Sequence, residues 1–302
     1  MITRVIWKIT FFVYKLLSPK KAWEFAMSPP VQFIFKLIIK LFGDHSINIK
    51  TKYGFNMILT VEEYLVGGYL HLGETNPFET NIMRKLLANG DVFFDVGAYK
   101  GWYAMNAAQI VGKNGNVFAF EANKEVARIL GSIQKLNGFN NIQVETVAVS
   151  DKNGTNKFWT GNKDMLGSLI KKHIQTYSDT PVNSIEIKTI TLDSFNKNKK
   201  LKKINMIKID VEGSDLDVLK GAGNILRKYS PYLLVEVFGL SADINKNRKN
   251  EILDYLSGFG YKPYQFVANG LKEFDSTQQD AQLINLFFAK TDRELRALGL
   301  LV

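Results

Sequence analysis

Cysteine is absent from the 302-residue sequence. Its absence excludes disulfides, zinc–thiolate sites and a thiol nucleophile, and it fits a reducing compartment. A long apolar run is also missing near the N-terminus. Residues 2–17 are interrupted by Arg4, Lys8 and Lys15, so they fall short of the roughly 18 apolar residues of a membrane-spanning helix. The same interruptions, with no small-residue cleavage site after them, argue against a signal peptide. We therefore expect a cytoplasmic protein that could associate with a membrane surface.

Acidic residues are scarce in residues 1–46, which we expect to form a basic helical arm. The first 41 residues hold seven lysines and arginines and a single acid, Glu24. The basic residues of the first helix would share one face, and residues 31–42 repeat this pattern with polar residues spaced by four. Two interpretations remain open. The arm either packs on the globular part of its own chain or lies as an amphipathic helix on an anionic membrane.

An alternation of strand and helix patterns follows residues 47–76, which we expect to form a hairpin and a connector. Strands are predicted at 92–96, 116–120, 142–149, 205–210, 232–237 and 284–289. Helices are predicted at 77–87, 101–111, 123–136, 214–227 and 247–257. This alternation predicts one α/β domain over residues 77–302, with a doubly wound, mostly parallel sheet and an antiparallel edge strand at 284–289. Residues 151–203 are an insert with strand-like pieces at 156–160 and 185–192. We expect this insert to form a hairpin and a loop over the carboxyl edge of the sheet.

A turn bounded by Gly97 and Gly101 follows the apolar strand at 92–96. Asp95 lies at the end of this strand, and a helix pattern begins directly after Gly101. Glycines at such a turn let a ligand approach bare backbone at a helix N-terminus. Ligands of open α/β sheets bind at the carboxyl ends of the strands. The turn is therefore a candidate ligand-binding loop.

The next strand ends in Glu121, 24 residues after Gly97. A carboxylate in this place accepts hydrogen bonds from ribose hydroxyls, which indicates a nucleoside-containing ligand. The dinucleotide motif G-x-G-x-x-G is absent, and Asp95 would repel a pyrophosphate. S-adenosylmethionine, which carries an ammonium and a sulfonium, suits these carboxylates better. Nearby aromatic residues could provide cation–π contacts or ordinary core packing. They are Phe78, Tyr99, Trp102 and Tyr103.

Two acidic residues, Asp210 and Glu212, stand at the end of the strand at 205–210 and in its tail before Gly213. If the alternation of the strand continues through this tail, both lie on the same side at the carboxyl edge. As candidate catalytic residues they would orient or deprotonate an acceptor hydroxyl. A structural interpretation stays open, in which one caps the next helix and the other pairs with a lysine. They could also hold a divalent cation, but a clear third ligand is missing, so we predict no metal site. His173, in the insert, is a further candidate base.

Four stretches occur in an order that is typical of one enzyme family. They are residues 95–103 (DVGAYKGWY), 120–123 (FEAN), 191–195 (TLDSF) and 207–213 (IKIDVEG), the last followed by VLKGA at 218–222. In these stretches the chain resembles the FkbM family of S-adenosylmethionine-dependent methyltransferases. The resemblance implies a class I methyltransferase (Rossmann-like) fold and usually O-methylation of a sugar or a secondary-metabolite hydroxyl. Tyr99 departs from the family pattern, which usually has asparagine there.

The residues expected to contact S-adenosylmethionine lie in or near these motifs. They are Phe78, Asp95, Gly97, Ala98, Tyr99, Gly101, Trp102, Tyr103, Glu121, Ala122, Asn123, Val147, Ala148 and Asp210. We expect a small-molecule or glycan acceptor. An RNA methyltransferase is less well supported, because the Asn/Asp-Pro-Pro-Tyr/Phe motif of exocyclic-amine methylases is absent after the fourth strand. A catalytically inactive methyltransferase fold at a membrane surface is the alternative without enzyme activity.

Overall fold

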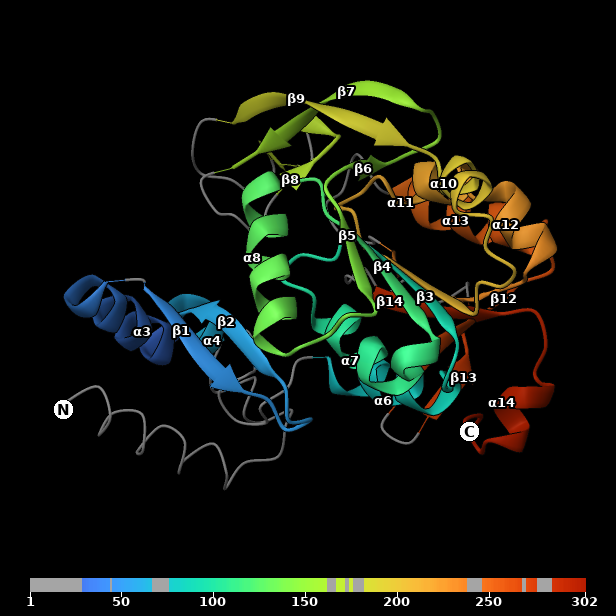
Figure 1. Ribbon diagram of the computed structural model, residues 1–302, viewed down its shortest axis with the longest axis horizontal. Coiled ribbons are helices and arrows are strands. Elements are labelled where there is room, and N and C mark those ends of the chain that lie inside the picture. Colours follow the sequence, from blue (N-terminus) through green and yellow to red (C-terminus); the bar gives the residue numbers. More distant parts are fainter. Residues whose placement is uncertain are drawn as a thin grey trace. The chain divides into compact units, whose positions relative to one another are not determined.

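The computed structural model of the chain describes nine segments in two compact units, residues 1–77 and 78–302 (Figure 1). The described segments are 29–43, 45–66, 76–161, 167–171, 174–175, 182–237, 246–267, 270–275 and 284–302. The helix expected within residues 2–17 lies outside them. Within the described part of the chain, no helix is both long and apolar enough to cross a membrane.

In the residues that the structure describes, the N-terminal unit contains a helix, a β-hairpin and a further, short helix. These are α3 (Pro29–Phe42), β1 (Ser46–Lys50), β2 (Asn56–Thr60) and α4 (Val61–Val66). The two strands pair antiparallel with Ile47 opposite Leu59, which confirms the predicted hairpin. Alternate residues of β2, Met57 and Leu59, are buried, as the period of two in a strand requires. Thr60 and Glu63 cap α4 reciprocally through backbone N–H bonds to each other's side chains.

Eight strands form the central sheet of the second unit. They are β3 (Val92–Val96), β4 (Asn116–Phe120), β5 (Ile142–Glu145), β10 (Met206–Ile209), β11 (Tyr232–Val237), β12 (Lys262–Val267), β13 (Gly270–Glu273) and β14 (Ile284–Ala289). Their order is β13-β12-β14-β11-β10-β3-β4-β5, and the strands from β11 to β5 are parallel. The predicted doubly wound, mostly parallel sheet is confirmed. β14 pairs antiparallel with β11 as expected, and β12 and β13 extend the sheet beyond it.

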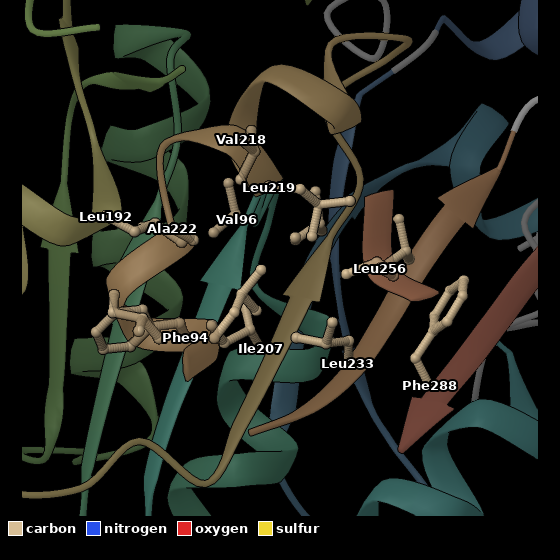
Figure 2. Packing of buried hydrophobic residues seen from close by; sticks show 14 of the residues in the cluster. Phe94, Val96, Leu192, Ile207, Val218, Leu219, Ala222, Leu233, Leu256 and Phe288 are labelled. Carbon is tan, nitrogen blue, oxygen red and sulfur yellow. The ribbon is translucent and has the colours of Figure 1, made fainter. Parts of the chain in front are cut away.

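The described helices that accompany this sheet are α6 (Pro77–Leu86), α7 (Trp102–Val111), the 3-10 turn η1 (Gly112–Asn114), α8 (Lys124–Leu136), α10 (Leu192–Lys199), α11 (Asp215–Lys220), α12 (Gly223–Lys228), α13 (Lys246–Ser257) and α14 (Arg293–Ala297) (Figure 1). Of these, α7, α8, α11 and α13 pack directly against its strands. Phe94, Ile207, Leu233 and Phe288, one from each of four neighbouring strands, lie in a row in the core (Figure 2). Phe195 of α10 meets Phe94 edge to face, with ring centroids 5.8 Å apart.

The structure corrects the strand predicted at 142–149. The strand in the central sheet ends at Glu145, whose carbonyl accepts the N–H of Val147 at 3.1 Å. This tight turn carries the chain out of the sheet. Ala148 then begins β6 (Ala148–Val149), which pairs with a strand of the insert and not with β4.

The structure also divides the helix predicted at 214–227 into α11 and α12. A side chain on Gly221, between them, would collide with the carbonyl oxygen of Ser150. The carboxylate of Asp193 accepts the N–H groups of Asn224 and Ile225 and so caps α12. The helical spacing of apolar residues continues through both helices. The end of α11 and the start of α12 are therefore apparent only from these long-range contacts.

The insert forms a small sheet of its own with β6. Its strands are β7 (Gly154–Thr160), β8 (Gly167–Ser168) and β9 (Asn183–Ile190), in the order β6-β9-β7-β8. β7 and β9 correspond to the expected strand-like pieces and pair antiparallel. The hydroxyl of Ser168 donates to the carbonyl oxygen of Glu212 at 2.7 Å. The insert therefore reaches the carboxyl edge of the central sheet, as expected.

Candidate functional site

The glycine loop, residues 97–101, connects β3 to α7 at the carboxyl edge of the sheet. Gly97 and Gly101 have φ angles of 74° and 85°, which favour glycine. A side chain on Gly97 would collide with the carbonyl oxygen of Asp210, directly after β10. On its other side, the N–H groups of Gly97 and the following residue donate to the carbonyl of Phe120, both at 3.0 Å. The loop is thus fixed between the ends of β10 and β4, the two strands that flank β3.

Glu121 links the glycine loop to the start of α8. Its Oε2 accepts the N–H of Tyr99 at 2.8 Å, and its Oε1 accepts the N–H of Asn123 at 2.8 Å. The first bond helps hold Tyr99 at a φ of 48°, an uncommon value for a bulky residue. Asn123 in turn caps α8 with its side chain. Burial raises the pKa of Glu121, although these hydrogen bonds oppose the shift.

Lys208 is a buried lysine at the centre of the carboxyl edge, beside Asp95 in the register of β10 with β3. Its Nζ lies 3.1 Å from Oδ2 of Asp210 and 3.9 Å from Oδ1 of Asp95. Nζ also donates to the carbonyl of Gly97 at 3.0 Å and lies 5.4 Å from the ring centroid of Tyr103. Burial alone would lower the pKa of Lys208, but the two carboxylates raise it overall, so the lysine is protonated.

Asp95 is fully buried and makes its contacts inside the protein. Its Oδ2 accepts the N–H of Ala104 at 2.9 Å, which satisfies one of the free donors in the first turn of α7. Burial raises the pKa of Asp95 to about 6, with Lys208 opposing the shift. Among the described residues, none donates a hydrogen bond to its Oδ1. The contacts of this carboxylate stabilise the glycine loop, and its expected role toward a cofactor stays a prediction.

Asp210 is more accessible, with 33% of its side chain exposed against 1% for Asp95. Desolvation alone would raise the pKa of Asp210, but Lys208 and a hydrogen bond with Glu236 lower it overall. The carboxylate is therefore ionised at neutral pH. It can accept a hydrogen bond from a molecule that reaches the carboxyl edge.

Glu236 lies next to Asp210, because Ile209 is paired with Val235 in the register of β10 with β11. Burial and the neighbouring carboxylates, Asp210 first and then Glu212, raise the pKa of Glu236 well above its usual range. Glu236 is therefore the protonated member of the pair and donates to Asp210. Within the described part of the chain, its Oε2 has no hydrogen-bond partner.

The row of polar groups continues onto β14 and α6. Asn285 is paired with Glu236 in the register of the two strands. Its Nδ2 donates to Oε1 of Glu79 at 3.2 Å. Burial raises the pKa of Glu79. Polar side chains from α6 and four neighbouring strands thus line up along one edge.

The segment after β10 differs from the expected strand continuation. β10 ends at Ile209, and Glu212 lies in a turn with a φ of 54°. The alternation of a strand therefore cannot place Asp210 and Glu212 on one face. Asp215, rather than either of them, accepts the N–H of Val211 at 3.1 Å. Burial and then the charge of Asp210 raise the pKa of Asp215 to about 7.

The remaining residues expected to contact the cofactor or the acceptor differ from one another in their burial. Ala98, Gly101, Trp102, Tyr103 and Ala148 are buried, and Ala122 and Val147 are half-buried. Nε1 of Trp102 donates to Thr80 at 2.9 Å, so this ring has a packing role. Phe78 is exposed, and His173 lies outside the described residues. Among the residues that the structure describes, no three His or acidic side chains are grouped as metal ligands.

Sequence reasoning assigned no role to Lys208 and Glu236. Each is a single charged residue inside an apolar strand, MIKI in β10 and YLLVEV in β11. A charged residue in such a strand needs a partner when it is buried. This is the sequence feature that could have indicated a role for both residues. The identity of the partners depends on the pairing of β3, β10 and β11.

Comparison with known proteins gives a family match. The model of the methyltransferase FkbM domain matches residues 95–263. The hexuronic acid methyltransferase AglP of Haloferax volcanii is 29% identical over 163 residues, which are 53% of this chain and 62% of that protein. The chain thus spans less than two thirds of the length of this relative.

Solved structures are similar at lower identity. Methyltransferase FkbM from Methylobacillus flagellatus KT is 16% identical, with 76% of this chain and 54% of that chain covered and a TM-score of 0.44. The O-methyltransferase from Bacillus cereus in complex with SAH is 13% identical, with 72% and 81% covered and a TM-score of 0.44. At these values the structures carry no information about a substrate.

Replacing Asp215 by Asn should change how stability depends on pH. The raised pKa means that folded Asp215 holds its proton more tightly than the unfolded chain does, so its contribution is lost as pH rises from about 4 through about 7. Asparagine keeps the acceptor for Val211 but does not titrate. We expect the free energy of unfolding of Asp215→Asn to gain on the order of 2–4 kcal/mol relative to the wild type between pH 4 and pH 8.

Urea unfolding at both pH values measures this difference. Asp151→Asn, at an exposed carboxylate, is the matched control and should show little change. An equal pH dependence of Asp215→Asn and the wild type would contradict the assignment.

Proposed function

Because the chain belongs to the methyltransferase FkbM family, we propose that it transfers a methyl group from S-adenosylmethionine to a hydroxyl of a sugar, glycan or small metabolite. The family match covers residues 95–263 and confirms both the resemblance and S-adenosylmethionine as the cofactor. The observation that carries the proposal is Asp210. It is an ionised, partly exposed carboxylate that adjoins the glycine loop and is held by Lys208.

The residues at the carboxyl edge fit the expected cofactor. Gly97 lets the glycine loop pack directly against the backbone of Asp210, which brings the loop and this carboxylate together at the edge. Each oxygen of Glu121 accepts one backbone N–H and keeps a second lone pair, so the carboxylate can accept both ribose hydroxyls as well. The buried Oδ1 of Asp95 accepts no hydrogen bond from the described residues, so it keeps an unsatisfied acceptor. Together these carboxylates favour a ligand with positive charge.

The protein's own part in the reaction is mainly positioning. When bound, S-adenosylmethionine supplies a methyl group on a sulfonium, which is already activated for an in-line displacement. Asp210 would accept the hydrogen bond of the acceptor hydroxyl and orient its oxygen. Because its pKa is lowered, Asp210 is a weak base. It therefore accepts the proton of the acceptor hydroxyl as the hydroxyl oxygen bonds to the methyl group and its O–H becomes more acidic. Lys208 and Glu236 hold Asp210 in its ionised form.

A sugar-type acceptor is supported by the relative that is named as a hexuronic acid methyltransferase. A hexuronic acid offers two kinds of oxygen, hydroxyls and a carboxylate. Methylation of a carboxylate needs no base, whereas an alkyl hydroxyl of high pKa benefits from one. Asp210 therefore favours ether formation at a hydroxyl. Glu212 and His173 stay in the proposal as further candidates for contacting the acceptor.

Glu121→Ala should weaken the binding of S-adenosylmethionine. The substitution removes charge-assisted hydrogen bonds to the ribose and also the bond that fixes Tyr99. We expect a loss of roughly 1–3 kcal/mol in binding free energy by titration calorimetry. Glu125→Ala, at an exposed glutamate in the first turn of α8, should bind as the wild type does. Unchanged affinity in Glu121→Ala would show that Glu121 has a structural role only.

Transfer of labelled methyl to a panel of neutral sugars, uronic acids and glycans tests the reaction itself. Treatment of the products with mild alkali distinguishes a stable ether from an ester that releases methanol. We expect alkali-stable label, and a rate about 10²–10⁴-fold lower for Asp210→Asn. Asp151→Asn serves as the control. Alkali-labile label would contradict the hydroxyl acceptor, and full activity of Asp210→Asn would contradict the role of Asp210. No binding of S-adenosylmethionine by the wild type would contradict the proposed function as a whole.

A further inference from the structure

Helix α3 of the N-terminal unit has two apolar faces, and within the described part of the chain one is buried and the other is exposed. Val31 and Phe35 are buried. On another side of the helix, four large apolar side chains are between 44% and 69% exposed. They are Phe33, Ile34, Leu37 and Leu41. At 100° per residue they occupy an arc of about 100°. We call these four residues the exposed face of α3.

Positive charge borders this face. Lys36 and Lys40 are exposed and lie next to the apolar arc along the helix. Lys50 and Lys52, in the hairpin of the same unit, are exposed as well. In the sequence from residue 29 to residue 60, these four lysines stand against one acid, Asp44. An apolar stripe with lysines at its border is the pattern of a helix that lies in a membrane interface.

We propose that the exposed face of α3 docks on an anionic lipid bilayer. Its 14 residues span about 21 Å, which is shorter than the roughly 30 Å hydrocarbon core, so the helix lies along the surface. Lysines beside the stripe attract anionic headgroups while the apolar side chains enter the acyl region. A second copy fits less well, because a symmetric contact through this face would bring the same lysines together.

Vesicle sedimentation of the full chain tests the proposal. The wild type should sediment with vesicles of phosphatidylcholine and phosphatidylglycerol, and much less with phosphatidylcholine alone. Leu37→Glu combined with Leu41→Glu should lower the affinity at least about tenfold. Lys36→Ser combined with Lys40→Ser should lower it by about tenfold and reduce its dependence on salt. The altered side chains are exposed, so folding should persist, and circular dichroism checks this.

Ile185→Glu is the matched control, since Ile185 is an exposed apolar residue of β9, outside α3. This variant should sediment as the wild type does. Equal sedimentation of the wild type and the α3 double variants would overturn the proposal. It would also be overturned if the wild type failed to sediment with anionic vesicles. A wild-type dimer that the Leu37 and Leu41 substitutions convert to a monomer, without vesicle binding, would assign the face to a second copy instead.

Discussion

The protonated amine of Lys208 is the contact on which the carboxyl edge of the sheet depends. It is buried between the carboxylates of Asp95 and Asp210 and also donates to the carbonyl of Gly97. Two carboxylates this close would otherwise repel each other in a poorly solvated place. One lysine thus joins the end of β3, the glycine loop and the end of β10. The glycine loop can approach β10 closely because Gly97 has no side chain.

The same charge distribution separates the acids of the edge into two kinds. Asp210, next to Lys208, is ionised, whereas burial and neighbouring carboxylates favour the protonated form of Glu236. Burial also raises the pKa of Asp95 and Asp215, to about 6 and about 7. At neutral pH the edge therefore combines two ionised carboxylates beside Lys208, Asp95 and Asp210, with a protonated Glu236. This arrangement leaves Asp210 as an accessible acceptor of hydrogen bonds. The proposed methyl transfer needs such a group to orient the acceptor hydroxyl.

The sequence predicts much of the fold, because each parallel strand is an apolar run bounded by turn residues and followed by a helix pattern. The positions of Gly97 and Glu121 at the ends of neighbouring strands also follow from local spacing, whereas the bond from Tyr99 to Glu121 is seen only in the structure. Lys208 and Glu236 could not be paired in this way, since their partners lie on other strands and depend on register. The break at Gly221 likewise depends on Ser150, far away in the chain.

The most direct test of this account measures how Lys208→Gln binds S-adenosylhomocysteine by calorimetry. Loss of the amine leaves Asp95 and Asp210 unpaired beside the glycine loop, so affinity should fall at least about tenfold. Adding Asp95→Asn should restore part of it by removing one of the repelling charges. Lys188→Gln, at an exposed lysine of β9, should bind as the wild type does. Wild-type affinity in folded Lys208→Gln would contradict the central position given to this lysine.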